Sequence, residues 1–238
     1  MSRSRQIMAL YEDNHILILE KPAGVLVHAD RSGDYTLLEA GKEYLKKTRN
    51  KPGDVFLKPV HRIDRPASGC QIFACTSKGL SRMNQLFRDR AISKEYFCLS
   101  TGDPIVESSE LVHWIKKDTE RNKSRVKKPD PRKKIPSNWQ VAKLKLELCG
   151  SSGNHHLYRI VLETGRPHQI RAQMAAVGAP LVGDLKYGGE KWQHKNAIAL
   201  HCFRMEFEHP VSGEQISVNC LPHGQAWEFF IPLIRDQL

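Results

Sequence analysis

Long apolar runs are missing from this chain of 238 residues. No stretch approaches the ~20 residues that a membrane-spanning helix needs. No apolar core follows the basic N-terminus 1–6, as a secretory signal would require. The six cysteines include no C-x-x-C pair, and most lie within apolar runs, where a cysteine behaves as a small buried hydrophobe. These absences argue against a cysteine-based zinc site and predict a reduced, cytoplasmic protein without membrane contact.

Linkers and internal repeats are also missing. No Gly/Ser-rich segment divides the chain, and its contents of 40% hydrophobic and 26% charged residues are typical of a soluble globular protein. A length of 238 residues suits one large domain or two small ones, and nothing in the composition marks a boundary. We therefore expect a single domain over residues 1–238.

Positive charge is in excess. The chain has 37 lysines and arginines against 26 acidic residues, a formal net charge of +11, and such a surface attracts polyanions. Segment 116–134 is the most basic part and contains no aromatic residue. Pro129, Pro131 and Pro136 argue against a regular helix or strand there, so we predict an extended basic loop. A solvated connector and an arm that contacts phosphates are equally compatible with this composition.

Hydrophobic periodicity indicates more strands than helices. Thr36 and Glu39 form a capping-box pattern at the start of the first helix, and Gly178 with Pro180 ends the third. The predicted strands cover residues 15–21, 70–75, 92–100, 110–115, 140–148, 155–163, 198–207 and 215–219, and the predicted helices 37–45, 77–88, 167–177 and the C-terminus. Many of these strands are sequentially antiparallel, which favours an α+β or mixed α/β domain over a doubly wound dinucleotide fold.

Asp64 lies between two arginines, Arg62 and Arg65, just before a small-residue turn that ends at Gly69. Nearby positive charge favours the ionised form of a carboxylate, which is the form that a nucleophile or a general base needs. Taken alone, the segment is equally readable as a surface cluster of ion pairs, most of which contribute little.

A second polar segment covers residues 164–171. A strand ends at Gly165, and a helix follows that carries Ile170 and Arg171 in its first turn. Helix N-termini favour anions, and an arginine there can bind a carboxylate or a phosphate through two hydrogen bonds. Spacing alone leaves open that Arg166, His168 and Arg171 are solvated residues at a helix start.

Five segments together resemble the RluA-like family of RNA pseudouridine synthases. They are HRIDRPASG (61–69), KEY (94–96), TGRPHQIR (164–171), GAPLVGDLKYGG (178–189) and LH (200–201). Their order and spacing match the family across roughly residues 10–220. The chain departs mildly from the usual motifs at Ile63, Ala67 and Pro167, where the family usually has Leu, Thr and Thr.

The resemblance implies an enzyme that breaks the N1–C1′ bond of a uridine in RNA, turns the uracil, and rejoins it through C5. It gives Asp64 the essential role, by attack on C1′ or by abstraction of a ribose proton. Arg171 would pair with this aspartate, Tyr96 and Ile170 would hold the uracil, and Arg62 would fill the gap left by the extruded nucleotide. The resemblance also implies substrate-binding roles for His61, Arg65 and Lys94.

The same resemblance implies a largely antiparallel mixed sheet flanked by helices, with a central cleft for RNA. The substrate would be a stem–loop of rRNA or tRNA, bound by a monomer without a cofactor or a metal. Because the chain begins close to the catalytic core, we expect it to lack the small N-terminal RNA-binding domain of some relatives. The alternative is a non-catalytic RNA-binding or ribosome-assembly factor on the same scaffold, which would not require Asp64, Tyr96 and Arg171 together.

Overall fold

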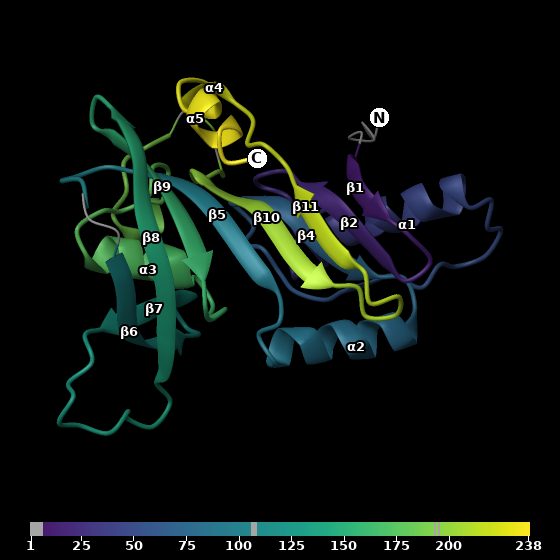
Figure 1. Cartoon of the computed structure of the whole chain (residues 1–238), viewed down its shortest axis with the longest axis horizontal. Helices are drawn as coiled ribbons and strands as arrows, with labels where there is room; N and C mark the ends of the chain where they lie inside the picture. The colour runs from purple at the N-terminus through teal and green to yellow at the C-terminus, as the bar shows by residue number, and fades with distance from the viewer. Residues whose placement is uncertain (1–6, 106–108, 193, 195) are drawn as a thin grey trace. The chain divides into compact units, whose positions relative to one another are not determined.

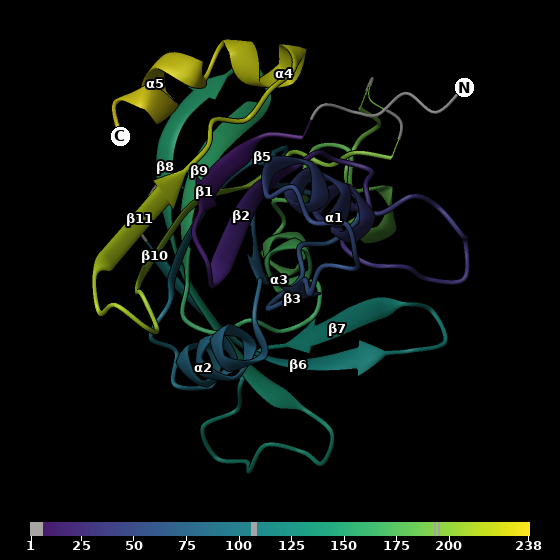
Figure 2. The same ribbon diagram turned by 90° about the vertical axis from the view of Figure 1, so that its right-hand side faces the viewer.

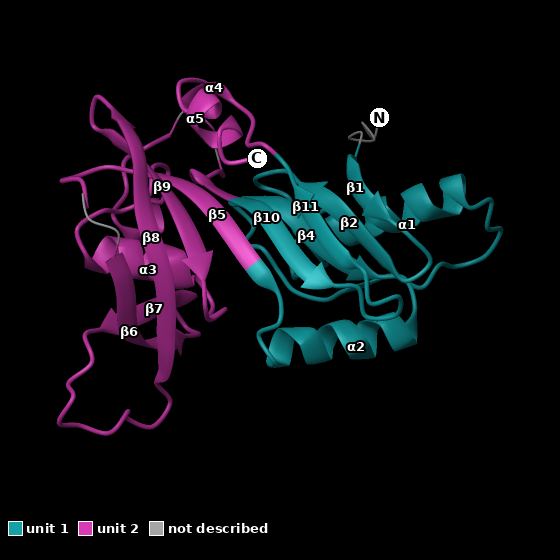
Figure 3. Cartoon of the chain, in the orientation of Figure 1, with its two compact units in different colours: residues 1–93, 202–220 teal, residues 94–201, 221–238 magenta. Residues whose placement is uncertain are grey.

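The computed structural model describes residues 7–105, 109–192, 194 and 196–238. The chain divides into two compact units, coloured separately in Figure 3. Unit 1 comprises residues 1–93 and 202–220, and unit 2 comprises residues 94–201 and 221–238. In the described part of the chain, the helices are all too short or too polar to cross a membrane.

Unit 1 is built on an antiparallel sheet (Figure 1). Its strands, in spatial order, are β1 (Ala9–Glu12), β2 (Ile16–Lys21), β4 (Ser68–Ala74) and β10 (Leu200–Glu208), with β3 (Lys58–Pro59) on β4 and β11 (Gln215–Asn219) on β10. Residues 16–19 of β2 are fully buried. Such a continuous apolar run suits a strand that is covered on both faces.

Two helices complete unit 1, α1 (Leu37–Thr48) and α2 (Ser77–Arg88). The predicted capping box is present, because the Thr36 side chain accepts a hydrogen bond from the Glu39 N–H and Glu39 accepts from the Thr36 N–H. Leu37 and Leu45 of α1 pack with Leu17 and Leu19 of β2 in one core cluster. A Cβ at Gly41 would come within 2.8 Å of Leu57, so close packing explains this glycine within the helix.

Unit 2 also contains antiparallel strand pairs. Its strands, in spatial order, are β5 (Ser93–Ser100), β9 (His155–Leu162), β8 (Gln140–Ser152), β6 (Ser109–Asp118) and β7 (Lys123–Lys127), and its helices are α3 (Gln169–Ala176), the 3-10 turn η1 (Leu185–Tyr187), α4 (Gln225–Glu228) and α5 (Ile231–Arg235). Helix α3 packs against β6 and β7. Most predicted elements are present within a few residues of their predicted bounds, and the α+β class is confirmed.

The predicted basic loop over residues 116–134 is wrong for much of its length. Residues 116–118 continue β6, and residues 123–127 form β7, so the segment begins as a β-hairpin (Figure 2). The prolines that argued against a strand all follow residue 127, where the chain becomes irregular. Ser124 is buried and Val126 half-buried, whereas Arg125 and Lys127 are exposed, and this alternation is typical of a strand with one covered face.

Candidate active site

Asp64 lies on the loop between β3 and β4 in unit 1, and its side chain is half-buried. The loop closes through a hydrogen bond from the Ala67 N–H to the Asp64 carbonyl (3.0 Å). It enters β4 through Gly69, whose φ of +116° disfavours any side chain. A Cβ at Gly69 would also clash with the backbone of Cys202. The turn that presents Asp64 therefore requires glycine at this position.

Two polar side chains fasten this loop to β4. Gln71 donates to the His61 carbonyl (2.7 Å) and accepts from the Ile63 N–H (3.2 Å). Nε2 of His61 accepts a hydrogen bond from the Ile72 N–H (3.0 Å), and its ring stacks on Phe87. These contacts give His61 a supporting role, and its predicted role in binding substrate stays a prediction.

Lys21 lies beneath the same loop and is completely buried. Its ammonium donates to the carbonyls of Pro22, Val25 and Arg65 at 2.8–3.0 Å. Burial lowers the pKa of Lys21 to about 7, although the nearby Asp64 carboxylate acts in the opposite direction. Lys21 is thus a buried amine within electrostatic reach of Asp64. The sequence reasoning missed it, and the signal was a lysine at the end of a largely apolar strand.

The two arginines that flank Asp64 have partners elsewhere in unit 1. Arg65 forms an ion pair with Asp34, and its Nε donates to the Gly24 carbonyl (3.1 Å). Arg62 is exposed, and its Nη1 lies 3.0 Å from Nε2 of His28. Both arginines therefore tie the loop to residues 24–34. Their predicted substrate contacts stay predictions.

In unit 2, Arg171 of α3 forms a buried ion pair with Asp184. Nε donates to Oδ2 at 2.6 Å and Nη2 to Oδ1 at 2.8 Å, and both side chains are almost fully buried. This two-point geometry rules out the reading of Arg171 as a solvated residue at a helix start. Asp184 was missed by the sequence reasoning, although it lies in the quoted segment 178–189. The predicted pairing of Arg171 with Asp64 stays a prediction.

Tyr187 joins three parts of unit 2. Its hydroxyl oxygen accepts from the Ser124 N–H (2.6 Å) and lies 3.0 Å from Nδ1 of His168. The guanidinium of Arg171 lies over its ring, 5.2 Å from the centroid. Burial raises the pKa of the Tyr187 phenol, so the hydroxyl stays protonated and can donate a hydrogen bond to Nδ1 of His168. His168 itself has a left-handed backbone (φ +53°) just before α3, an uncommon conformation for a residue other than glycine.

Tyr96 lies on β5 and is 9% exposed. Phe97 points to the opposite face and is fully buried, as predicted from strand alternation. On the face of Phe97, Glu95 accepts two hydrogen bonds from Arg159 at 2.9–3.0 Å. Ile170 is buried at the start of α3, and Lys94 is half-buried at the start of β5. The roles of Tyr96, Ile170 and Lys94 toward a uracil stay predictions.

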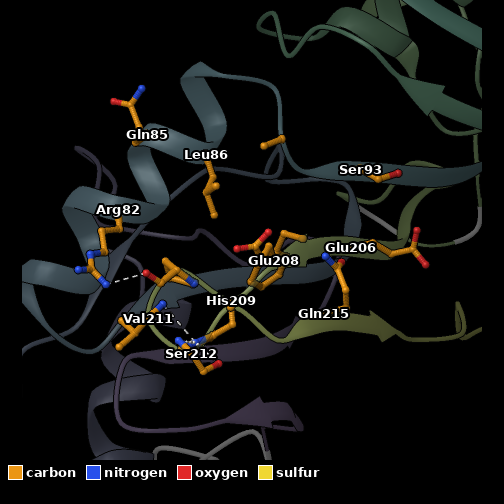
Figure 4. A pocket seen from close by; sticks show the side chains of 14 residues that line it. Arg82, Gln85, Leu86, Ser93, Glu206, Glu208, His209, Val211, Ser212 and Gln215 are labelled. Carbon is orange, nitrogen blue, oxygen red and sulfur yellow. Dashed lines mark hydrogen bonds between the residues drawn. The ribbon is translucent and has the colours of Figure 1, made fainter.

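A cavity of about 800 Å³ lies elsewhere in unit 1 (Figure 4). Its walls come from α2, from residues 91–93 and from the β10–β11 hairpin. Arg82 closes one side by donating to the Pro210 carbonyl (2.7 Å), and Nδ1 of His209 accepts from the Ser212 N–H (3.0 Å). Among the described residues that line this cavity, none belongs to the predicted site.

Comparisons with known proteins relate the chain to one family. The family signature described as RNA pseudouridylate synthase matches residues 15–176. Ribosomal large subunit pseudouridine synthase C of Buchnera aphidicola subsp. Acyrthosiphon pisum is 33% identical over 219 residues, and the match covers 88% of this chain and 65% of that protein. tRNA pseudouridine synthase C of Haemophilus ducreyi is 28% identical over 231 residues, 92% of each chain.

A solved structure gives the same picture for the fold. Human RNA Pseudouridylate Synthase Domain Containing 4 superposes with a TM-score of 0.76 at 18% identity, covering 95% of this chain and 92% of the human chain. At this identity the likeness concerns the fold, and it confirms the predicted α+β architecture.

Proposed function

The chain belongs to the RNA pseudouridylate synthase family, and from that premise we propose that Asp64 is the carboxylate with which it isomerises uridine in a structured rRNA or tRNA. As a member of this family it is an isomerase that acts on RNA. The substrate names of its relatives are divided between ribosomal RNA and tRNA. Either RNA fits the basic chain, because phosphate contacts dominate the affinity for nucleic acids.

The observation that carries the assignment is the way unit 1 holds Asp64. The loop is closed by the Ala67 N–H, is fastened to β4 by Gln71, and enters the strand through Gly69. A catalytic group must be held in place by its surroundings, and these contacts hold the loop that carries Asp64. Lys21 lies beneath the same loop, close enough to Asp64 for the two groups to interact electrostatically.

The reaction needs an ionised carboxylate next to the sugar. Breaking the N1–C1′ bond leaves uracil carrying the electron pair at N1 and an electron-deficient C1′. Asp64 either attacks C1′ to form an ester or removes the C2′ proton to give a glycal. The uracil then turns and C5 bonds to C1′. The same step breaks the ester bond between C1′ and Asp64, or in the other route Asp64 returns its proton to C2′ of the glycal. The C5 proton is then lost while N1 gains one. The product is an isomer of the substrate, so no redox step is required.

The other site residues take supporting roles in this proposal. Tyr96 and Ile170 hold the free uracil while it turns, and Arg171 is the arginine that acts on the catalytic carboxylate. Arg62 occupies the space that the extruded nucleotide leaves, with Lys94 on the phosphate backbone. Extrusion costs a few kcal/mol and is cheapest where a base is unpaired, which favours a stem–loop substrate. We further propose that residues 1–238 act as one catalytic domain, as a monomer in the cytoplasm.

Release of tritium from [5-³H]uridine in bulk rRNA and tRNA tests the activity, because the new C5–C1′ bond expels the C5 hydrogen. We expect release by the wild type, and a loss of at least ~1000-fold in Asp64→Asn. The matched control is Asp54→Asn, whose exposed carboxylate pairs with Lys46 of α1, and it should retain release. Release by neither the wild type nor the control on any RNA would favour the non-catalytic binding factor.

A further inference from the structure

The hairpin of β6 and β7 has two chemically different faces. In the register of this pair, Ile115 is opposite Val126, and Lys116 is opposite Arg125. The face of Ile115 and Val126 packs with Ala172 of α3 in a core cluster. The other face carries Lys116, Arg125 and Lys127, and the last two side chains are exposed. The hairpin therefore packs against the protein through its apolar face and presents positive charge on its other face.

The covered face is fastened to the two motifs that hold Arg171. The Ser124 N–H donates to the Tyr187 hydroxyl and the Ser124 hydroxyl donates to the Pro167 carbonyl, both at 2.6 Å. Lys186 reaches the Asn122 carbonyl at the hairpin turn (3.1 Å). The basic face is therefore fixed relative to α3 within unit 2, and is not a flexible arm.

One of the outward charges is oriented by aromatic rings. The ammonium of Lys127 lies 4.4 Å from the centre of the Trp139 ring and 5.5 Å from that of Trp114. Such contacts hold a cation in place by its attraction to the ring face. A preoriented ammonium loses less side-chain entropy when it binds a phosphate. Asp118 pairs with Arg125 (2.9 Å) and tempers, but does not cancel, the positive charge of this face.

We propose that the outward face of the β6–β7 hairpin, with Lys116, Arg125 and Lys127, binds the phosphate backbone of the substrate RNA beside the target uridine. This rests on the proposed function for the identity of the RNA. We choose RNA over an acidic protein because the hairpin is fixed to the motifs that hold Arg171. A ligand that contacts both the hairpin and these motifs must be extended and negatively charged, as the substrate RNA is.

The test compares two triple variants of the full chain. Lys116→Gln/Arg125→Gln/Lys127→Gln removes three charges from the hairpin, and Lys42→Gln/Lys46→Gln/Lys47→Gln removes three from α1. Binding of a stem–loop RNA that supports tritium release, or otherwise of an rRNA stem–loop, is measured from 50 to 300 mM KCl. For the hairpin variant, the slope of log K against log[KCl] should become shallower by about 2–3, since each phosphate contact contributes about 0.7–0.9. The α1 variant should keep the wild-type slope.

Conservative variants separate charge from folding. Lys116→Arg/Lys127→Arg, made in the wild type, keeps both charges and should keep the wild-type slope. Trp139→Leu should weaken RNA binding a few-fold while leaving the slope nearly unchanged. An unchanged slope in the hairpin variant, or an equal change in the α1 variant, would overturn the proposal. Polyglutamate stands for an acidic protein, and a hairpin variant that loses binding to polyglutamate but not to RNA would also overturn the proposal. If wild type releases no tritium but the hairpin variant shows the shallower slope, the proposed activity fails and the RNA-binding face stands.

Discussion

Arg171 and Asp184, thirteen residues apart in the chain, form a buried ion pair with two short hydrogen bonds. Asp184 precedes the 3-10 turn that carries Tyr187, and the Tyr187 ring lies under the same guanidinium. The guanidinium is thus held in position by a carboxylate and an aromatic ring of its own unit. An arginine held in this way can act on a substrate or on a second carboxylate without first having to be ordered.

Asp184→Asn should destabilise the protein strongly, because it leaves a buried guanidinium without its counter-charge. Breaking a buried pair from one side costs about 3–5 kcal/mol, and we expect a fall in the free energy of unfolding of that order, measured by urea denaturation. The double variant Arg171→Met/Asp184→Leu removes both charges and should lose less stability than either single charge removal. A double variant as unstable as the sum of the two singles would show that the pair is not coupled.

Local signals located most elements of the fold. Helix α2 was predicted to the residue, because its apolar positions recur at helical spacing from Ser77 to Arg88. The composition of segment 116–134 does not reveal the β6–β7 hairpin, because Pro129 and Pro131 disfavour regular structure only after residue 127. Its aromatic partners Trp114 and Trp139 lie just outside that segment, so composition within the window did not show them.

The sequence points to candidate site residues only where the signal is local. Asp64 and Arg171 stand out by their residue types and their motifs, but their supports do not. Lys21 is brought under the Asp64 loop by pairing of β2 with β4, and Asp184 reaches Arg171 through a turn after α3. Contacts of this kind depend on packing of the whole unit, which periodicity and spacing do not encode.

Gly69→Ala should prevent unit 1 from folding stably. Gly69 has φ of +116°, and a Cβ there would clash with the Cys202 backbone, which cannot give way as a flexible side chain can. Backbone strain alone costs of order 1–3 kcal/mol, and the clash adds to it, so a lowered Tm and insoluble expression are expected. Gly53→Ala is the control, because nothing lies within 4 Å of its Cβ position and its φ is not in the left-handed region. Equal melting temperatures of the two variants would contradict this account.

Stability should rise with pH above neutrality because of Lys21. Its pKa is lowered by burial from 10.5 to about 7, so between these values the unfolded chain holds a proton that the folded chain lacks. The free energy of unfolding then increases with pH by at most about 1.4 kcal/mol per unit. Lys21→Met should abolish this rise between pH 7 and 8.5, whatever its effect on absolute stability. Equilibrium unfolding in urea at several pH values, with reductant present, measures the slope.

Above about pH 9 the buried thiols should reverse the trend. Burial raises the pKa of Cys75 from 9.0 to about 11 and that of Cys98 further. The unfolded chain then loses protons that the folded chain keeps, so the free energy of unfolding falls as pH rises. Cys98→Ala should flatten this falling limb, since alanine does not ionise. If the free energy of unfolding falls with pH as steeply in Cys98→Ala as in the wild type, other groups cause the loss of stability.

Tyr187→Phe should loosen the connection between the hairpin and the start of α3. The variant removes the oxygen that accepts from the Ser124 N–H, and Ser124 is only 2% exposed. An unsatisfied buried donor costs about 1–3 kcal/mol. Hydrogen exchange at the Ser124 amide should therefore accelerate about tenfold or more, since ~1.4 kcal/mol corresponds to a factor of ten. Tyr11→Phe is the control and should leave hydrogen exchange at the Ser124 amide unchanged. The Tyr11 hydroxyl donates to the side chain of Asp13 in a half-buried position, where water can replace it. Unchanged exchange at Ser124 in Tyr187→Phe would mean that the hairpin is held by its apolar face, with Ile115 and Val126 against α3, and that the hydroxyl adds little.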